Sequence, residues 1–362
     1  MSLLFEPIAI GNLQLRNRIM RSATAEWLAD KESGAPLPQL GGMYRELAEG
    51  GVALIVTGHA CVAYSGRTNE HMTAMGSDEL VPAWRDVIRP AQEAGARVMI
   101  QINHGGANVD GRVVDQALSP SGVATNDLAR PRALSGDEVL ELADAFGQAA
   151  RRAREAGFDG VEIHGAHGYL ISQFLSPLTN RRQDAWGGDL QARRRFLQAV
   201  YQRVRQAVGP DYPVWIKLGV AGRRESGLSI AEGAQVAAAC FEYGIECVEI
   251  SHALGQPEEL DMRLEAPYLP MAQAVRRAVG PDRPLALVSG FRTRGKMHEV
   301  LDSGVVQMIS LCRPLIAEPD LPDKLRDGLT DEAACTRCDL CRPGASGEPI
   351  ACQNPRVLES LS

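Results

Sequence analysis

The sequence predicts a closed (β/α)₈ barrel, and three observations lead to that fold class. Eight short runs rich in β-branched residues recur along the 362 residues, and most are continuously apolar, as parallel strands covered on both faces are. Helical patterns separate these runs, and a glycine near the helix end stands in every link between them, where a left-handed stop is common. A doubly wound sheet is the alternative, but no Gly-x-Gly-x-x-Gly motif follows the first strand.

The predicted strands leave room for one helix between each neighbouring pair, as right-handed crossovers require. A hairpin around Gly11 and Asn12, over residues 8–15, precedes the first strand, and we expect it to close the bottom of the barrel. The strands are expected at 18–22, 52–58, 97–103, 159–164, 213–219, 246–251, 284–289 and 306–311.

Capping signals mark where helices begin. Ser135 and Glu138 form a capping box, in which the serine accepts from a free backbone N–H and the glutamate reaches back. Ser229 and Glu232 form a second box, and Asp189 starts a third helix. The arginines at 193–195 are expected on a solvated helix face or as loop anchors. The helix-end glycines are Gly51, Gly95, Gly157, Gly209, Gly244, Gly280 and Gly304.

Composition and charge exclude several classes of protein. The chain has 38 Lys and Arg against 45 Asp and Glu, a net charge of −7, and 5% aromatic residues, which argue against a nucleic-acid surface. Apolar runs stay short of the ~20 residues of a membrane span, and the first residues do not resemble a signal peptide. We expect a cytoplasmic protein with no nucleic-acid or membrane partner, and a homo-oligomer stays open.

Residues 329–362 differ from the rest of the chain in cysteine content. Cys335, Cys338, Cys341 and Cys352 are four of the eight cysteines and have the spacing C-x₂-C-x₂-C-x₁₀-C. We therefore divide the chain into a barrel, 1–328, and a Cys-rich extension, 329–362, packed on it. The remaining cysteines lie in apolar surroundings and are expected to be small buried hydrophobes: Cys61, Cys240, Cys247 and Cys312.

The spacing of the four C-terminal cysteines predicts one [4Fe–4S] cluster. Three thiolates this close in sequence form a compact cup, which a distant fourth thiolate closes. A zinc site more often takes two separate C-x₂-C pairs, whereas here the two pairs overlap at Cys338. Structural zinc and an empty remnant of a former site are the alternatives.

Catalytic residues in such a barrel belong to the loops that follow the carboxyl ends of the strands. Two of these loops are long, from residue 104 to about 135 and from 164 to about 188. The second opens with His164, His167 and Tyr169. Two imidazoles can donate hydrogen bonds to an oxygen that gains negative charge, and a phenol beside them can deliver a proton. A structural pair of histidines, or half of a metal site, is the alternative.

Residues 159–196, DGVEIHGAHGYLISQFLSPLTNRRQDAWGGDLQARRRF, resemble the signature segment of the Old Yellow Enzyme family of FMN-dependent oxidoreductases. Shorter matches are LFEPIAIGNLQLRNRI at 4–19, QINHGG at 101–106, and SGFRT and SLCRPLIAEPDL around the last two strands. The resemblance implies an FMN enzyme with NAD(P)H as reductant. It also implies reduction of activated C=C bonds in a small electrophilic substrate, with hydride from the flavin and a proton from tyrosine.

The resemblance assigns roles to individual residues. His164 and His167 match the pair that holds the substrate oxygen, and Tyr169 matches the proton donor. Gln101 matches the residue that pairs with the flavin pyrimidine edge. Lys217 stands where the family usually has arginine near flavin N1 and the C2 oxygen, so the cation is kept but the two-pronged fork is lost. The remaining flavin contacts are assigned to the ring edge (Ala23, Thr24, Ala25) and to the phosphate (Gly290, Cys312, Arg313).

One departure from the family concerns the flavin ring edge. Ala25 stands where many relatives have Thr or Cys, so a side-chain modulator of the flavin potential is absent. Thr24 replaces it only if its side chain points inward; otherwise it is a strand-end residue. His104, in QINHGG, is expected to shape the pocket, and His59 and His71 receive no role.

The cysteine spacing resembles that of trimethylamine dehydrogenase and 2,4-dienoyl-CoA reductase, which suggests an alternative function. In that alternative the protein is a flavin/iron–sulfur dehydrogenase or reductase that exchanges electrons with a separate carrier protein. A third possibility from another class is a barrel acting on RNA or a zinc-stapled binding module, which the acidic charge and low aromatic content disfavour.

Overall fold

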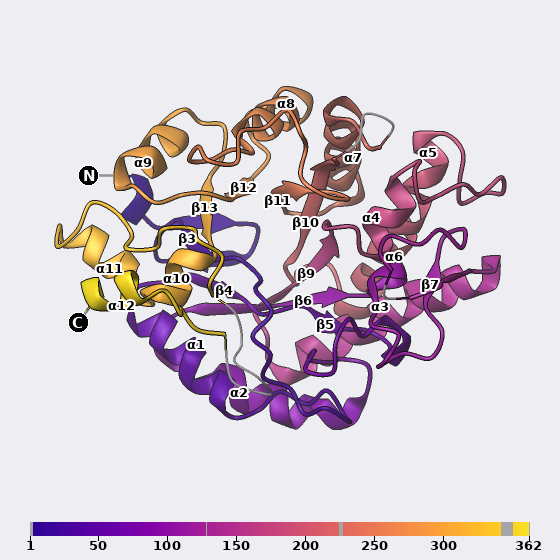
Figure 1. Cartoon of the computed structure of the whole chain (residues 1–362), viewed down its shortest axis with the longest axis horizontal. Helices are drawn as coiled ribbons and strands as arrows, with labels where there is room; N and C mark the ends of the chain where they lie inside the picture. The colour runs from indigo at the N-terminus through magenta and orange to yellow at the C-terminus, as the bar shows by residue number, and fades with distance from the viewer. Residues whose placement is uncertain (1–2, 128, 224–226, 342–349, 362) are drawn as a thin grey trace.

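The computed structural model describes residues 3–127, 129–223, 227–341 and 350–361 of the chain. Within these residues eight parallel strands form a closed barrel (Figure 1), which confirms the predicted fold class. The barrel closes because β4 pairs with β6 as well as with β3. The barrel strands are β3 (Ile19–Arg21), β4 (Leu54–Val56), β6 (Arg97–Asn103), β9 (Gly160–Gly165), β10 (Val214–Ala221), β11 (Cys247–His252), β12 (Leu285–Val288) and β13 (Met308–Leu311).

The predicted hairpin at the start of the chain is present and closes the bottom of the barrel. Strands β1 (Ile8–Ile10) and β2 (Leu13–Leu15) pair antiparallel. Their buried side chains join one apolar cluster with residues from the amino-terminal halves of the barrel strands, among them Trp215, Met308 and Met99. This cluster fills the amino-terminal end of the barrel with apolar side chains.

Helices surround the barrel in the order that the sequence predicts (Figure 1). The larger cluster of buried apolar side chains lies between these helices and the outer face of the sheet. The outer helices are α1 (Gln39–Glu49), α2 (Val81–Glu93), α3 (Gly136–Ala156), α6 (Arg195–Val208), α7 (Ile230–Tyr243), α8 (Leu269–Val279), α9 (Arg294–Asp302) and α11 (Leu321–Arg326). Shorter elements in the loops and at the chain ends are α4 (Leu170–Leu175), α5 (Leu190–Arg193), α10 (Arg313–Ala317), α12 (Pro355–Leu361), β5 (Ala60–Cys61), β7 (Leu118–Ser119), β8 (Arg132–Ala133) and the 3₁₀ turns Leu3–Phe5, Tyr64–Gly66, Asp78–Leu80 and Gly106–Asn108.

The predicted helix boundaries are confirmed, with one correction. Both capping boxes are formed, and the glycines predicted at the helix ends all have positive φ. Asp189 caps α5, but the helix is interrupted at Arg194 before α6 begins. Arg193 was expected on a solvated face or as a loop anchor; it is buried, because its guanidinium bonds the backbone oxygen of Leu175 and the carboxylate of Glu232. It therefore anchors α5 to the start of α7.

Residues 331–334 lie against the segments that follow the last two barrel strands. The backbone of Ala333 donates to Arg292, and the backbone of Ala334 donates to the Glu318 carboxylate at 2.6 Å. Helix α12 follows and lies beside α10 and α11 in the view of Figure 1. The stretch 342–349, between Cys341 and Cys352, lies outside the described residues.

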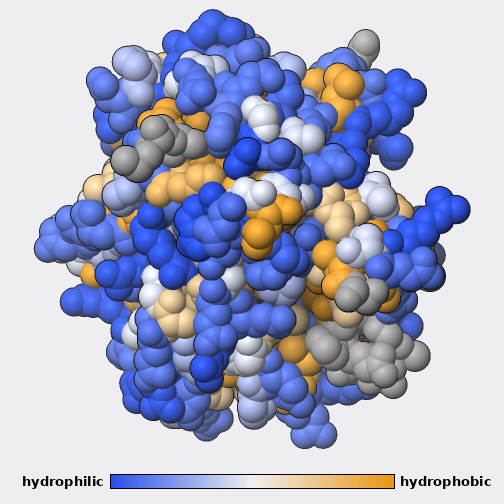
Figure 2. All heavy atoms as spheres, turned by 90° about the vertical axis from the view of Figure 1, so that its left-hand side faces the viewer, coloured by the Kyte–Doolittle hydropathy of each residue, from blue (hydrophilic) through white to orange (hydrophobic). Residues whose placement is uncertain are grey.

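The side of the molecule on the left in Figure 1, where α10, α11 and α12 lie, is mostly hydrophilic, with small separate apolar patches (Figure 2). Across the described part of the chain, every helix is too short or too polar to cross a bilayer.

Two helical glycines offer a matched test of the packing between helix and barrel. A Cβ at Gly233 of α7 would lie 1.9 Å from the backbone oxygen of Val220, whereas a Cβ at Gly295 of α9 would meet nothing within 4 Å. We expect Gly233→Ala to lower the free energy of unfolding by about 1–3 kcal/mol, because α7 or β10 must shift. Gly295→Ala should raise it by up to about 1 kcal/mol through helix propensity. Urea denaturation measures both, and equal stabilities would contradict the close contact.

Candidate active site

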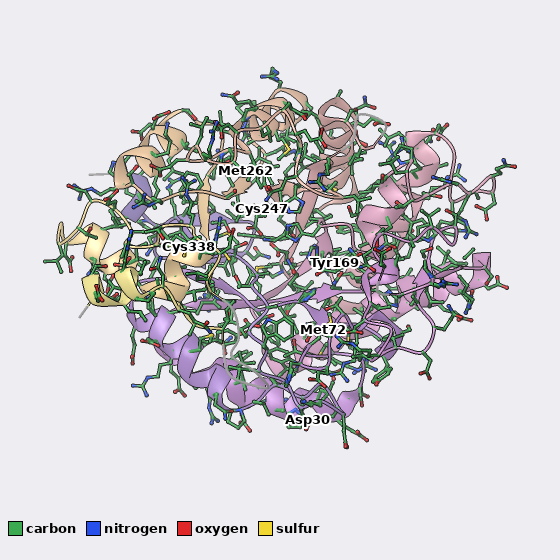
Figure 3. The ribbon with its side chains drawn as sticks, viewed as in Figure 1. Asp30, Met72, Tyr169, Cys247, Met262 and Cys338 are labelled. Carbon is green, nitrogen blue, oxygen red and sulfur yellow. The ribbon has the colours of Figure 1, made fainter. Side chains whose placement is uncertain are left out.

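Three aromatic side chains predicted to be catalytic meet at the carboxyl end of β9. The ring of His164 lies 5.0 Å from that of His167 and 4.8 Å from that of Tyr169, measured between centroids. Tyr169 is the residue before α4, and Figure 3 shows it beside β6 and β9. The positive φ of His167, 57°, turns the chain sharply between the two other residues. The loop therefore brings all three rings to one place.

A fourth ring in this cluster, His59, had no role in the sequence analysis. It follows β4 and lies 5.1 Å from Tyr169 and 6.0 Å from His164 between ring centroids. Its Nδ1 is 2.9 Å from the side-chain nitrogen of Asn103, which can only donate, so the ring proton is on Nε2. The sequence did offer one signal for His59, its position just after a barrel strand, because the functional side chains of this fold converge there.

Buried amide and imidazole groups hold the two long loops together. Gln173 donates to the backbone oxygen of Gly168 at 2.7 Å and to that of Gly105 at 3.2 Å. His104 is fully buried and accepts from the backbone of Gly106 at 3.1 Å, so it fixes the start of the third loop; its expected role in shaping the pocket stays a prediction. These bonds fix the segment that carries Tyr169 relative to the neighbouring strand.

The imidazoles are neutral hydrogen-bond donors near pH 7. Burial, reinforced by nearby cationic groups, holds the pKa of His164 and the pKa of His167 well below the usual histidine value. The backbone of Ala166 donates to Nδ1 of His164 at 3.2 Å, so the proton of that ring is on Nε2. Burial also raises the pKa of Tyr169 to about 12, so the phenol keeps its proton. The cluster can therefore donate several hydrogen bonds without carrying charge.

The end of β11 supports His167 from the other side. Its Nε2 is 2.8 Å from the hydroxyl of Ser251, and its ring lies 4.5 Å from that of His252. The backbone of His167 donates to the backbone oxygen of His252 at 3.0 Å. Nδ1 is thus the nitrogen of His167 left for a substrate. Ser251 and His252 were missed in the sequence, although both stand at the end of a strand.

The two predicted flavin contacts inside the barrel each bind an acidic side chain. The amide of Gln101 donates to Glu162 at 2.6 Å, and the ammonium of Lys217 lies 2.7 Å from Glu249 and 2.6 Å from the Ser22 hydroxyl. Lys217 pairs in register with His164, so this layer adjoins the ring cluster. The two glutamates were missed, and their signal was a carboxylate within an otherwise apolar strand.

A small pocket of about 40 Å³ opens where β12 and β13 end, and it contains the predicted phosphate residues. Gly290, Cys312 and Arg313 line it, and Gly290 has a φ of 71°. Arg337 also lines this pocket, and the sequence analysis missed it. It lies between Cys335 and Cys338 in the chain, so the cysteine-rich segment reaches the same pocket. Two guanidinium groups in one pocket suit a phosphate.

The ring-edge residues after β3 are placed differently from one another. The Thr24 hydroxyl donates to the backbone of Ser22 at 3.0 Å and lies 3.0 Å from Sγ of Cys312. Ala25 lines a smaller pocket together with His59 and Trp27. Cys312 is half-exposed, so its interpretation as a buried hydrophobe was wrong; it stands at the amino end of α10, where the phosphate pocket keeps its sulfur accessible.

The four C-terminal cysteines do not form a metal site in the described residues. No group of three or more His, Cys, Asp or Glu side chains there is arranged to hold a metal ion, so this prediction is not confirmed. Cys335 is buried, Cys338 is exposed, and Cys341 and Cys352 are half-buried. Burial raises the pKa of the Cys335 thiol.

Comparisons with known proteins show the family and the fold of the chain. Residues 3–332 match the NADH:flavin oxidoreductase / NADH oxidase family. The chain is 33% identical over 345 residues to a metal reductase of Desulforamulus reducens, covering 94% of this chain and 51% of that protein. It is 32% identical over 332 residues to an NADPH dehydrogenase of Geobacillus sp. (strain WCH70), covering 89% and 93%. An Old Yellow Enzyme homologue from Zymomonas mobilis matches with a TM-score of 0.80 at 26% identity, covering 92% and 95%. The chain spans about half the length of the metal reductase.

The buried neutral histidines predict how stability depends on pH. Burial lowers the pKa of His59 and of His104 to about 4, against about 6.5 in an unfolded chain. Between these values the unfolded chain binds more protons, so stability is complete above pH 6.5 and falls as the pH falls toward 4. At pH 5, each of these two histidines should lower the free energy of unfolding by about 2 kcal/mol relative to its value above pH 6.5.

Urea denaturation at pH 7.5 and pH 5 measures this loss of stability. In His104→Gln the loss between the two pH values should be smaller by about 2 kcal/mol. An unchanged loss would show that His104 is already protonated in the folded protein or is solvated there.

Proposed function

We propose that this chain, which belongs to the NADH:flavin oxidoreductase / NADH oxidase family, reduces activated carbon–carbon double bonds of small electrophiles. Membership of the family makes the protein a NAD(P)H:flavin oxidoreductase, with FMN as its flavin. The observation that supports ene-reduction is the convergence of neutral His164, neutral His167 and protonated Tyr169 at one strand end. An enone or nitroalkene needs hydrogen bonds to its oxygen and a proton for one carbon.

The residues present fit both ends of FMN, its phosphate and its ring. Arg313 and Arg337 line the same pocket as Gly290, which is the chemistry that a phosphate requires. Gln101 and Lys217 supply an amide and a cation inside the barrel, as the polar edge of the flavin requires. Backbone groups of Ala23, Thr24 and Ala25 would hold the ring edge. FMN, when bound, takes hydride from NAD(P)H and delivers it to the substrate.

The chain's own residues then bind the substrate and protonate it. Nε2 of His164 and Nδ1 of His167 would hold the substrate oxygen and stabilise the negative charge that develops there. Because both rings are uncharged, they donate hydrogen bonds without giving up a full proton. The hydroxyl of Tyr169 would protonate the carbon next to the carbonyl or nitro group. Its pKa of about 12 keeps it in the acid form needed for that step.

One observation favours a second function, in which electrons also pass to or from a separate carrier protein. Arg337 joins the phosphate pocket to the segment of Cys335 and Cys338, and the Arg313 guanidinium forms an ion pair with Asp339 in that segment. A relative of twice this length is named a metal reductase. A flavin/iron–sulfur dehydrogenase or reductase would use this connection between flavin and cysteines.

The remaining features of the proposal concern organisation. We divide the chain at 328/329 into an FMN barrel and a Cys-rich extension, and we propose that the extension binds [4Fe–4S], with zinc as the alternative. A cytoplasmic location and a homo-oligomer stay predictions from the sequence.

Replacing Tyr169 tests the proposed proton transfer. Tyr169→Phe keeps the ring but removes the proton, so reduction of the flavin by NAD(P)H should be unchanged in rate. Reoxidation by an enone should slow by roughly 10²-fold. Anaerobic stopped-flow absorbance measures the two half-reactions separately, and Tyr64→Phe is the matched control because Tyr64 is 59% exposed.

Equal slowing of both half-reactions would remove Tyr169 from this role. Normal flavin reduction without turnover of any enone, maleimide or nitroalkene in the unaltered protein would instead favour the electron-carrier function.

Metal analysis tests the extension. Protein purified without oxygen from iron-replete cells should contain about four irons and four sulfides per chain, with brown absorbance beneath the flavin bands. Cys338→Ser should lose the iron, whereas Cys240→Ala, at a buried cysteine of α7, should retain it. Stoichiometric zinc without iron would refute the iron–sulfur prediction.

A further inference from the structure

Three ionisable side chains form a cluster inside the barrel. Of these, only Lys217 has a role in the proposed function. Lys217 is 1% exposed, and Glu162 and Glu249 are completely buried. They come from the adjacent strands β10, β9 and β11. If both carboxyl groups were ionised, the cluster would hold an uncompensated negative charge away from water, which is costly. One of the two carboxyl groups must therefore carry a proton.

The hydrogen-bond donors identify Glu249 as the ionised group. Its oxygens accept from the Ser22 hydroxyl at 2.9 Å and from the Ser310 hydroxyl at 2.5 Å, and the Lys217 ammonium lies 2.7 Å away. Two hydroxyls and one cation surround this carboxylate, and no such set surrounds Glu162. Glu162 accepts from the amide of Gln101.

One buried oxygen that remains without a hydrogen bond in the described residues, Oε1 of Glu162, locates the proton. Oε2 of Glu249 is held by the Lys217 ammonium at 2.7 Å. The two carboxyl groups are hydrogen-bonding neighbours. A proton on Oε1 of Glu162, donated to the Glu249 carboxylate, satisfies the oxygen of Glu162 that lacks a partner.

We propose that Glu162 is a neutral carboxylic acid and Glu249 the anionic counter-ion of Lys217, so that Glu249 limits the positive charge that Lys217 presents to bound FMN. Glu249 is then a positioning residue that acts through Lys217. The second half of this inference rests on the proposed function, in which Lys217 faces the flavin. A reduced flavin carries more negative charge than an oxidised one, so a compensated lysine favours the reduced form less than a lone cation would.

The titration behaviour of the surrounding groups is consistent with this assignment. Burial, and then the charge of Glu249, raises the pKa of Glu162 well above the usual value. Burial opposes ionisation of Glu249 too, but the charge and hydrogen bond of Lys217 and the Ser310 hydroxyl outweigh it, so its pKa stays below the usual value. Neighbouring His164 is neutral, and burial raises the pKa of Cys247 well above that of a free thiol.

The redox equilibrium of bound FMN tests the assignment, because glutamine copies a protonated glutamic acid but not a carboxylate. The measured quantity is the affinity of the protein for reduced FMN divided by its affinity for oxidised FMN. Glu162→Gln should change this ratio by less than about threefold. Glu162→Gln/Glu249→Gln leaves Lys217 without a counter-ion and should raise that ratio at least tenfold, about 30 mV in a two-electron potential. The single Glu249→Gln variant is less informative, because Glu162 could ionise in its place.

A dye-coupled equilibrium titration of the holoenzyme gives these potentials. A large shift in Glu162→Gln alone would overturn the proposal, because it would mean that Glu162 carries the negative charge. An unshifted double variant would overturn the role of Glu249.

Infrared spectroscopy of the FMN-free protein tests the proton without the flavin, and does so even if the double variant fails to fold. The unaltered protein at pH 7 should show the C=O band of a buried protonated carboxylic acid, and Glu162→Gln should lose it. Absence of the band from the unaltered protein, or its survival in the variant, would overturn the assignment. A protein that shows the band but does not bind FMN would contradict the proposed function and leave the shared proton supported.

Discussion

Pairing of β4 with β6 is the constraint on which the arrangement of the site depends. It closes the sheet and so brings eight strand ends, which are far apart in the chain, to one rim. His59 and His164 come from different strands, yet their rings lie 6.0 Å apart because the barrel is closed. The hairpin fills the other end with apolar side chains. Because Lys217 and Glu249 are buried inside this closed barrel, leaving either charge without its partner would be costly.

The sequence predicted those parts of the molecule whose cause is local. Apolar runs gave all eight barrel strands, and Ser135 and Ser229 marked helix starts because a capping box involves residues three positions apart. His164 and Tyr169 were found because they share one short segment at a strand end. Hydrogen bonding across the barrel has no such local pattern. The carboxylate of Glu249 takes its partners from β10, β13 and the end of β3, and nothing near residue 249 in the chain announces them.

The burial of Arg193 and the position of Arg337, which the sequence did not predict, have the same origin. Arg193 was expected to be solvated or a loop anchor because arginine usually is solvated, but a backbone oxygen and a carboxylate from distant segments satisfy it in the interior. Arg337 was missed because it lies among cysteines that were interpreted only as metal ligands. In the folded chain it lines the pocket at the ends of β12 and β13. Membership of a flavin oxidoreductase family accounts for the barrel. The contacts of Glu162, Lys217 and Glu249 inside the barrel are seen only in the folded chain.

Arg337 has a consequence for how the molecule is assembled. Its guanidinium donates to the backbone oxygen of Leu264 while also lining the pocket of Arg313. A phosphate held in that pocket and a docked C-terminal segment would therefore stabilise each other, by thermodynamic reciprocity. Under the proposed function, cofactor retention and docking of the C-terminal segment would then be thermodynamically coupled. Damage to the tail by a protease or an oxidant would then be felt first as leakage of the flavin, before the barrel itself lost any structure.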